Sequence, residues 1–180
     1  MLQRIKSYII FLQTRLEKLK QDQEPENHFI FTDSDIAVIG NLEDMFSDYR
    51  NFDLALTFRN NKDQPLNSGF IAIRGTADGI QRGVAFLQEV LEVYSSKFMR
   101  ASRMLGDQLA LAWVVKSKPN FNMKEGAGQF HGMPLGVKVI HFKGSRKRLM
   151  LEAWNYYLSS HNLPDMLCLI LRSGRAKYDF

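Results

Sequence analysis

Apolar residues recur at helical spacing in three stretches of the chain. Over residues 2–19 they fall at every third or fourth position with charged residues between them, which predicts an amphipathic helix that ends before Pro25. A second helix is expected after Thr76, whose hydroxyl suits the N-cap, with Asp78 in its first turn. A third helix is expected to begin at Asp107.

Short apolar runs between and after these helices predict strands. The predicted strands lie at residues 29–31, 53–58, 69–73 and 137–142. Residues 36–39 continue apolar and lead into a helical turn at 41–46, while 116–134 form a long loop and 145–158 a final helix. Strands that alternate with helices predict one α/β domain over residues 1–180, with a mixed sheet flanked by helices.

The composition is that of an ordinary globular protein, with 45% hydrophobic and 24% charged residues. The net charge of +5 is concentrated late, because five basic residues fall within eleven positions. They are Lys138, Lys143, Arg146, Lys147 and Arg148. Such a cluster suits phosphate or another anion, or simply a solvated helix face. The charge is modest and no recognised nucleic-acid-binding module surrounds it, so a nucleic-acid partner is not expected.

The sequence carries no visible address for a membrane or for the secretory pathway. No apolar run approaches the roughly 20 residues that cross a bilayer, and no signal-peptide core follows the first residues. Cys168 is the only cysteine, so an intrachain disulfide is excluded.

Two carboxylates follow the first predicted strand, at Asp33 and Asp35 with Ser34 between them. Acidic side chains spaced in this way at a strand end can turn toward one hard divalent cation such as Mg²⁺ or Mn²⁺. The alternative is a pair of turn-forming or helix-capping aspartates.

A second group of polar residues follows the last predicted strand. His141 ends that strand, Gly144 permits close backbone approach, and Lys147 opens the final helix. A helix N-terminus with a lysine suits a phosphate group, and histidine suits a metal. The alternative for His141 is an ordinary hydrogen-bonded residue.

Three further stretches carry candidate polar chemistry. Asp107 with Gln108 opens the third helix, where an N-cap is the plainer interpretation. Asn67, Ser68 and Gly69 precede a strand, where they suit either sugar hydroxyls or an ordinary turn. The glycines of residues 125–132 follow no strand and open no helix, so we interpret them as a flexible loop able to lie over a substrate.

The order of these elements resembles the metal-dependent GT-A glycosyltransferases. A strand ending in Asp-x-Asp, an Asn-Ser-Gly strand start, Asp-Gln, and His-x-x-Gly-x-x-Lys follow one another. The chain is most similar to the retaining group that includes glycogenin-like and galactinol-synthase-like enzymes. Residues 67–76, 100–115 and 126–155 resemble plant nucleotide-diphospho-sugar transferase-like proteins, and the resemblance covers about residues 29–157.

The resemblance implies a site and a reaction. Asp33 and Asp35 would bind Mn²⁺ or Mg²⁺ or contact the nucleotide ribose, and His141 would be the third protein ligand of the metal. Gly144 and Lys147 would hold the diphosphate of a nucleotide sugar, most simply a UDP-sugar. The sugar would pass to a glycan or another acceptor, and relatives of this kind work in the Golgi. The remaining implied residues are Asn67, Ser68 and Gly69 for substrate binding, and Asp107 and Gln108 facing the transferred sugar.

The chain departs from the GT-A pattern in two places. Strands and helices that bind the nucleotide base normally precede the helix expected at residues 2–19, and a further apolar strand normally precedes the His-x-x-Gly strand. We therefore expect a partial GT-A (Rossmann-like) fold that lacks the first nucleotide-binding strands, as in a truncated or alternatively spliced product. An inactive glycosyltransferase remnant that acts as a binding or structural protein is the alternative.

A phosphatase of the haloacid-dehalogenase type is a second alternative, with Asp33 as nucleophile and Asp35 as acid. Two positions weigh against it. Position 111, four residues after Asp107, is leucine where that class has a second acid, and Ala37 stands where threonine or valine is usual.

Overall fold

The computed structural model describes residues 2–21, 25–38, 40–58, 65–100, 106–117 and 139–141. Predictions for the loop after residue 117, the final helix, Gly144, Lys147 and Cys168 lie outside these residues. The chain divides into two compact units, which we describe separately. The first comprises Met1–Asp33 and Glu43–Gln129, and the second comprises Ser34–Leu42 and Phe130–Phe180. The single-domain assignment for residues 1–180 stays a prediction.

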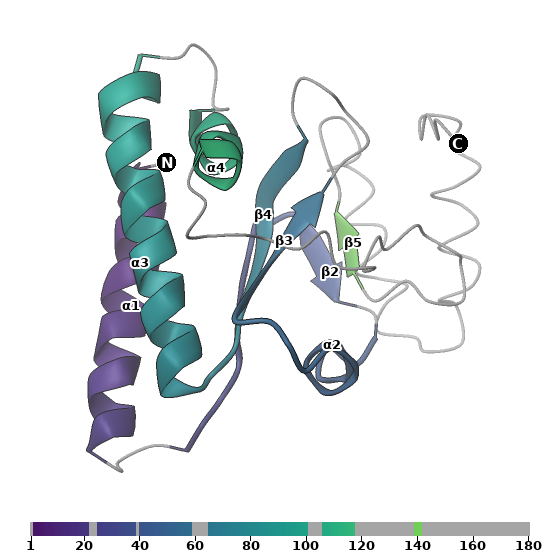
Figure 1. Cartoon of the computed structure of the whole chain (residues 1–180). Coiled ribbons are helices and arrows are strands. Elements are labelled where there is room, and N and C mark those ends of the chain that lie inside the picture. Colours follow the sequence, from purple (N-terminus) through teal and green to yellow (C-terminus); the bar gives the residue numbers. More distant parts are fainter. Residues whose placement is uncertain are drawn as a thin grey trace, which may run out of the picture. The chain divides into compact units, whose positions relative to one another are not determined.

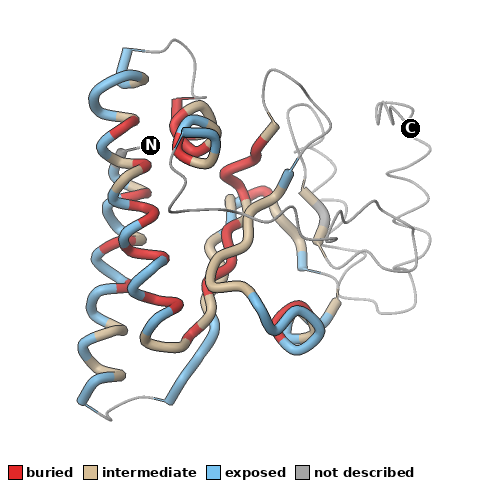
Figure 2. The backbone as a smooth tube through the Cα atoms, viewed as in Figure 1, coloured by how far each residue is buried: buried red, intermediate tan, exposed pale blue. Residues whose placement is uncertain are grey.

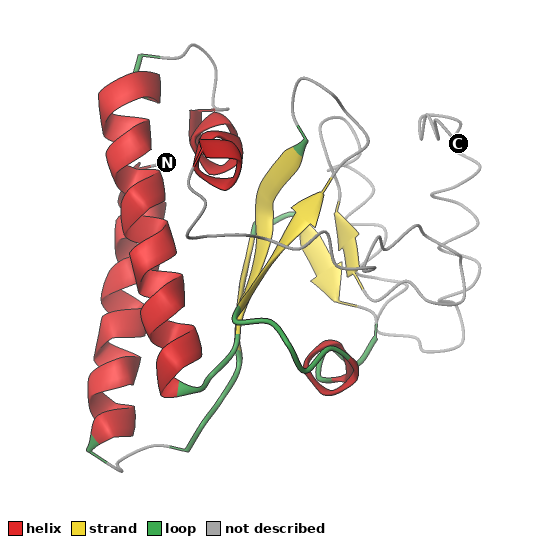
Figure 3. Ribbon diagram, in the orientation of Figure 1, coloured by secondary structure: helices red, strands yellow, loops and turns green. Residues whose placement is uncertain are grey.

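The described elements are four α-helices, a π-helical turn and two small antiparallel sheets (Figure 1, Figure 3). In the first unit they are α1 (Leu2–Lys20), β1 (Phe29–Thr32), α2 (Asp44–Asp48), β3 (Leu54–Phe58), β4 (Leu66–Ile73), α3 (Ala77–Val93), the π-turn η1 (Tyr94–Phe98) and α4 (Gly106–Ser117). The second unit contains β2 (Ile36–Val38) and β5 (Val139–His141). The predicted α/β class and the three helices predicted within the described residues are confirmed.

The three-stranded sheet has the order β1-β4-β3, with β4 in the centre. Phe29 of β1 and Leu54 of β3 both lie opposite Ile73 of β4, and the register with β3 shifts between Leu56 and Thr57. Both strand pairs are antiparallel. The parallel pairing that a mixed sheet also requires does not occur among the described strands.

Side chains alternate between the two faces of this sheet, as the pleat of a strand requires. On one face, Ile71 and Ile73 of β4 join a core to which α1, α3 and α4 contribute (Figure 2). The residues of α1 in this core are Ile5, Ile9 and Leu12, at the helical spacing expected from the sequence. The three helices therefore cover one face of the sheet.

The opposite face carries a smaller apolar cluster. Met45 and Phe46 of α2 pack with Ala72 of β4, and Ile30 and Phe70 lie against them. The central strand β4 is consequently buried on both faces, and its residues are at most partly exposed along its whole length. The short helix α2 serves to cover this second face.

Arg74, directly after β4, holds the loop that follows α2. Its Nε donates to the carbonyl oxygen of Phe52 at 2.8 Å, and Nη2 donates to the carbonyls of Tyr49 at 2.7 Å and Phe46 at 3.1 Å. The guanidinium also lies over the Phe52 ring, 4.8 Å from its centroid. One cation thus binds three backbone carbonyls, one in α2 and two in the loop that follows it.

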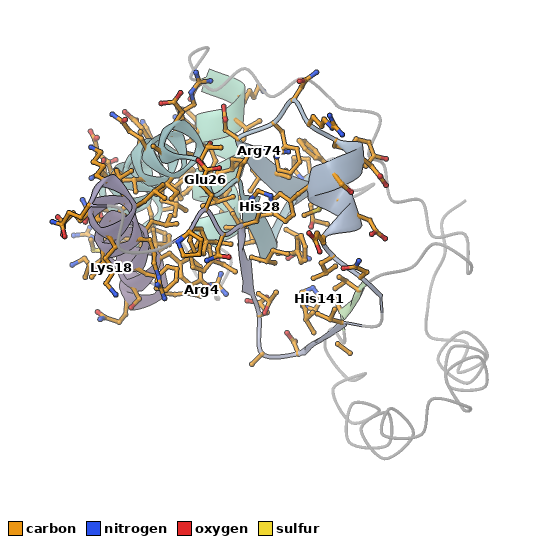
Figure 4. All side chains as sticks on the ribbon, turned by 90° about the horizontal axis from the view of Figure 1, so that it is seen from below. Arg4, Lys18, Glu26, His28, Arg74 and His141 are labelled. Atoms are coloured by element: carbon orange, nitrogen blue, oxygen red, sulfur yellow. The ribbon has the colours of Figure 1, made fainter. Side chains whose placement is uncertain are left out.

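His28 ties the segment before β1 to the turn between β4 and α3 (Figure 4). Its Nδ1 accepts a hydrogen bond from the Gly75 backbone N–H at 3.0 Å, and its ring stacks on Phe46 with centroids 4.1 Å apart. The approach is close: a Cβ at position 75 would lie 2.0 Å from the carbonyl oxygen of Asn27. Glycine is therefore required here by space.

The Thr76 side chain caps α3 as the sequence predicts, and this cap can be tested. Thr76 Oγ1 accepts from the Gly79 N–H at 3.1 Å. We expect Thr76→Ala to lower the free energy of unfolding by about 1 kcal/mol, because one N–H of the first turn loses its acceptor. Thr76→Ser keeps the hydroxyl and should stay close to the unmodified protein in urea denaturation. Equal losses for both substitutions would contradict the capping role.

The contact of His28 predicts a pH dependence of stability. Burial lowers the pKa of His28 from its ordinary 6.5, and Arg74 lowers it further, while Glu26 and Glu43 oppose the shift. The neutral ring is favoured in the folded protein, so its contribution to stability is complete above pH 6.5 and is lost as the pH falls from there through the folded-state pKa. Denaturation at pH 7.5 and pH 5.5 should show the loss. In His28→Gln, which retains an acceptor but does not titrate, the loss should be smaller.

Candidate functional site

The guanidinium of Arg4 on α1 joins three polar side chains of the first unit. Its Nη1 pairs with the carboxylate of Asp33, and its Nη2 donates to Asp107 Oδ2 at 2.6 Å and to Ser68 Oγ at 3.0 Å. Ser68 Oγ itself donates to Asp107 Oδ2 at 2.7 Å. We call these four residues the Arg4 network.

The backbone brings the members of the Arg4 network together. Asp33 comes directly after β1, and its N–H donates to the Gly69 carbonyl at 2.9 Å, which continues the pairing of β1 with β4. Ser68 belongs to β4 and is therefore close to the end of β1. Asp107 is the second residue of α4, a helix that packs on β4.

Gly106 allows α4 to begin inside the core. A Cβ at this position would lie 2.7 Å from Cε2 of Tyr94 and 3.0 Å from the carbonyl oxygen of Phe98. The close packing on η1 places Asp107 in the interior, where its side chain accepts from Arg4 and Ser68. The space at position 106 therefore requires glycine.

The Arg4 network is electrostatically unbalanced. One guanidinium faces two carboxylates, of which Asp107 is only 2% exposed and Asp33 is 25% exposed. Among the described residues, Asp107 Oδ1 and Arg4 Nε have no hydrogen-bond partner although both are buried. Buried polar atoms of this kind are rare in folded proteins, and they often mark a place where a ligand or water binds.

A small cavity lies beside the network. Arg4, Tyr8, Ser68 and Asp107 line one part of it, and apolar side chains of the core line the rest. The Tyr8 ring stacks on Phe31 with centroids 4.1 Å apart. Burial raises the pKa of the Tyr8 hydroxyl, with smaller contributions from Asp33 and Asp107, whereas Arg4 lowers it. The hydroxyl is therefore a proton donor or acceptor that stays neutral at ordinary pH.

Asn67, Ser68 and Gly69 lie within β4, and not in the turn that was the alternative interpretation of this stretch. Asn67 is 4% exposed, and its Oδ1 accepts from the Gly69 N–H at 3.0 Å. Gln108 is partly exposed in the first turn of α4. Of the residues expected to contact substrate, Ser68 and Asp107 come together, and the Asn67 amide is used within its own strand.

The second unit contains another pair of predicted site residues. Antiparallel pairing of β2 with β5 places Ile36 opposite His141. Asp35, directly before β2, thereby comes within reach of the imidazole, and Asp35 Oδ1 lies 3.1 Å from His141 Nε2. Asp35 is 9% exposed as a whole residue, and both side chains are largely buried.

Sequence reasoning did not identify Arg4. The feature that could have pointed to Arg4 is its position in the helix. Arg4 lies on the buried side of α1, one turn before Tyr8 and directly before the buried Ile5. A cation in an apolar stripe needs a buried anion, and several anions were possible. The partners of Arg4 could not be read from the helix pattern.

Comparisons with known proteins give no relative. No family model, no curated protein and no solved structure matches this chain. In the part of the chain that the structure describes, no helix is long and apolar enough to cross a membrane, as expected from the sequence.

The Arg4 network predicts a strong dependence of stability on charge pairing. Arg4→Met leaves the Asp107 carboxylate buried without its cation, which should lower the free energy of unfolding by about 3 kcal/mol. Adding Asp107→Asn removes that charge and should recover part of the loss. A double-mutant cycle from chemical denaturation measures the coupling, and additive losses would contradict a direct Arg4–Asp107 interaction.

Proposed function

We propose that this chain is a metal-dependent glycosyltransferase of the GT-A type, which binds a nucleotide-diphospho-sugar and moves its sugar to a glycan or another acceptor. The observation that carries the proposal is the Arg4 network. Asp33, Ser68 and Asp107 lie in three separate segments, and the order of those segments is what resembles the family. Their meeting at one guanidinium supports a common site.

In this proposal Asp33, Asp35 and His141 bind the cation. Each offers one oxygen or nitrogen ligand of the kind that Mn²⁺ accepts. Asp35 Oδ1 and His141 Nε2 lie 3.1 Å apart in a hydrogen bond that the cation would replace. Asp33 is two positions from Asp35, so chain connectivity keeps their Cα atoms within about 7 Å.

The proposed role of each residue follows from how far its side chain is buried. A divalent cation, when bound, neutralises the charge that grows on the departing diphosphate. Ser68 and Arg4 lie beside the cavity, and both donate hydrogen bonds to the deeply buried Asp107, which holds them in place. Gln108 is partly exposed and suits a polar contact with the transferred sugar. Gly144 and Lys147 remain the proposed diphosphate contacts from the sequence alone.

The GT-A fold, the donor and the cellular compartment are parts of the same proposal. The antiparallel sheet and the helices that cover its faces would be part of a GT-A domain. A UDP-sugar remains the proposed donor, and the Golgi the proposed site of action. These features rest on the resemblance of residues 29–157 to plant nucleotide-diphospho-sugar transferase-like proteins.

Calorimetric titration with Mn²⁺ and UDP tests the proposed site. We expect the unmodified chain to bind UDP only when Mn²⁺ is present, and Asp35→Ala or His141→Ala to abolish that binding because each removes a ligand. Asp53→Ala is the matched control, since Asp53 is an aspartate paired with the exposed Arg82 and lies outside the proposed ligand set.

The outcomes separate the proposal from its alternatives. Absence of Mn²⁺-dependent binding by the folded, unmodified chain would favour an inactive remnant. Hydrolysis of a generic phosphate ester that depends on Asp33 would favour phosphatase chemistry and would contradict the glycosyltransferase assignment.

A further inference from the structure

We propose that Arg4 competes with the divalent cation for Asp33, so that cation binding releases Arg4 from Asp33 and leaves it held by Asp107 and Ser68. The inference rests on the proposed function in one respect, namely that Asp33 is a metal ligand. It adds an intramolecular contact that sets how tightly the cation binds.

Arg4 and the proposed cation would both bind the Asp33 carboxylate. Arg4 Nη1 donates to Asp33 Oδ1, and this pair is part-buried, with 28% of the Arg4 side chain and 25% of the Asp33 side chain exposed. A charged hydrogen bond occupies a carboxylate lone pair that a metal would use. A cation that takes Asp33 therefore has to weaken or displace this contact.

The rest of the Arg4 network makes that displacement possible. Nη1 contacts Asp33, whereas the separate nitrogen Nη2 contacts both Asp107 and Ser68. Asp107 is 2% exposed, so leaving its carboxylate without a counter-charge would cost far more free energy than leaving the more exposed Asp33 without one. Releasing Nη1 thus leaves no buried charge without a partner, because the contacts of Nη2 remain.

Release of Arg4 from Asp107, in place of Asp33, would cost more free energy. If Arg4 left Asp107, a carboxylate deep in the core would lose its cation while one of its oxygens already lacks a hydrogen-bond partner among the described residues. Asp33 is the contact that can be exchanged at lower cost. The geometry therefore indicates that Arg4 leaves Asp33 and stays bound to Asp107.

Binding of Mn²⁺ alone, measured from the electron paramagnetic resonance signal of the unbound ion, tests the competition without any assay of activity. Arg4→Gln removes the charge and retains a donor for Asp107. Arg4→Lys keeps the charge, but a single ammonium cannot span Asp33 and the Asp107–Ser68 pair, and the buried Asp107 should retain it. Arg82→Gln is the matched control, because Arg82 also pairs with an aspartate, Asp53, on the surface.

We expect both Arg4 variants to bind Mn²⁺ about tenfold more tightly than the unmodified chain, the factor that corresponds to the loss of one competing charge-assisted hydrogen bond. Arg82→Gln should leave the affinity unchanged. Tighter binding by Arg4→Gln alone would mean that charge acts without the contact, and would overturn the competition. So would unchanged or weaker binding by both variants.

Two results keep this inference apart from the proposed function. Mn²⁺ binding that is equal in the unmodified chain and in both Arg4 variants overturns the competition and leaves the metal site standing. Absence of Mn²⁺ binding from all four proteins overturns the metal site and the competition together. If Arg4→Gln does not fold, as circular dichroism will show, Arg4→Lys decides the question.

Discussion

The pairing of Arg4 with the buried Asp107 is the interaction on which the rest of the first unit depends. A carboxylate that is 2% exposed in an apolar core is very costly without a cation, and α1 supplies that cation from a segment 103 residues away. Arg4 joins α1 to Ser68 of β4 and Asp107 of α4. The same guanidinium pairs with Asp33 at the end of β1, so that the members of the candidate site share one side chain.

The apolar parts of the fold are arranged around this polar centre. Helices α1, α3 and α4 cover one face of the sheet, and α2 covers the other, so that β4 is buried on both sides. The antiparallel pairing of β1 with β4 places Asp33 beside Gly69, the neighbour of Ser68. Gly106 lets α4 begin against η1 with Asp107 turned inward. Each polar member is therefore positioned by a packing constraint.

A buried charged group of this kind is weak evidence for stability, since well-packed apolar residues often serve a core as well or better. It is better evidence for a ligand-binding site, particularly because Asp107 Oδ1 and Arg4 Nε lack hydrogen-bond partners among the described residues. In the second unit, Asp35 Oδ1 and His141 Nε2 lie 3.1 Å apart, at hydrogen-bonding distance. The unpartnered atoms of Asp107 and Arg4 are the observation behind the proposed substrate site.

The sequence by itself determined the local elements: the amphipathic α1, the Thr76 cap of α3, and the short apolar runs that form β1, β3 and much of β4. It also selected Asp33, Ser68 and Asp107 as residues of interest. Only the tertiary structure decided that Asn67–Gly69 lie within β4, that Asp107 is a buried partner of Arg4, and that Arg4 belongs to the site. Helical periodicity and capping act over a few residues, and so the sequence displays them directly. The contacts of Arg4 span 29, 64 and 103 positions, and only the packing of helices on the sheet fixes those distances.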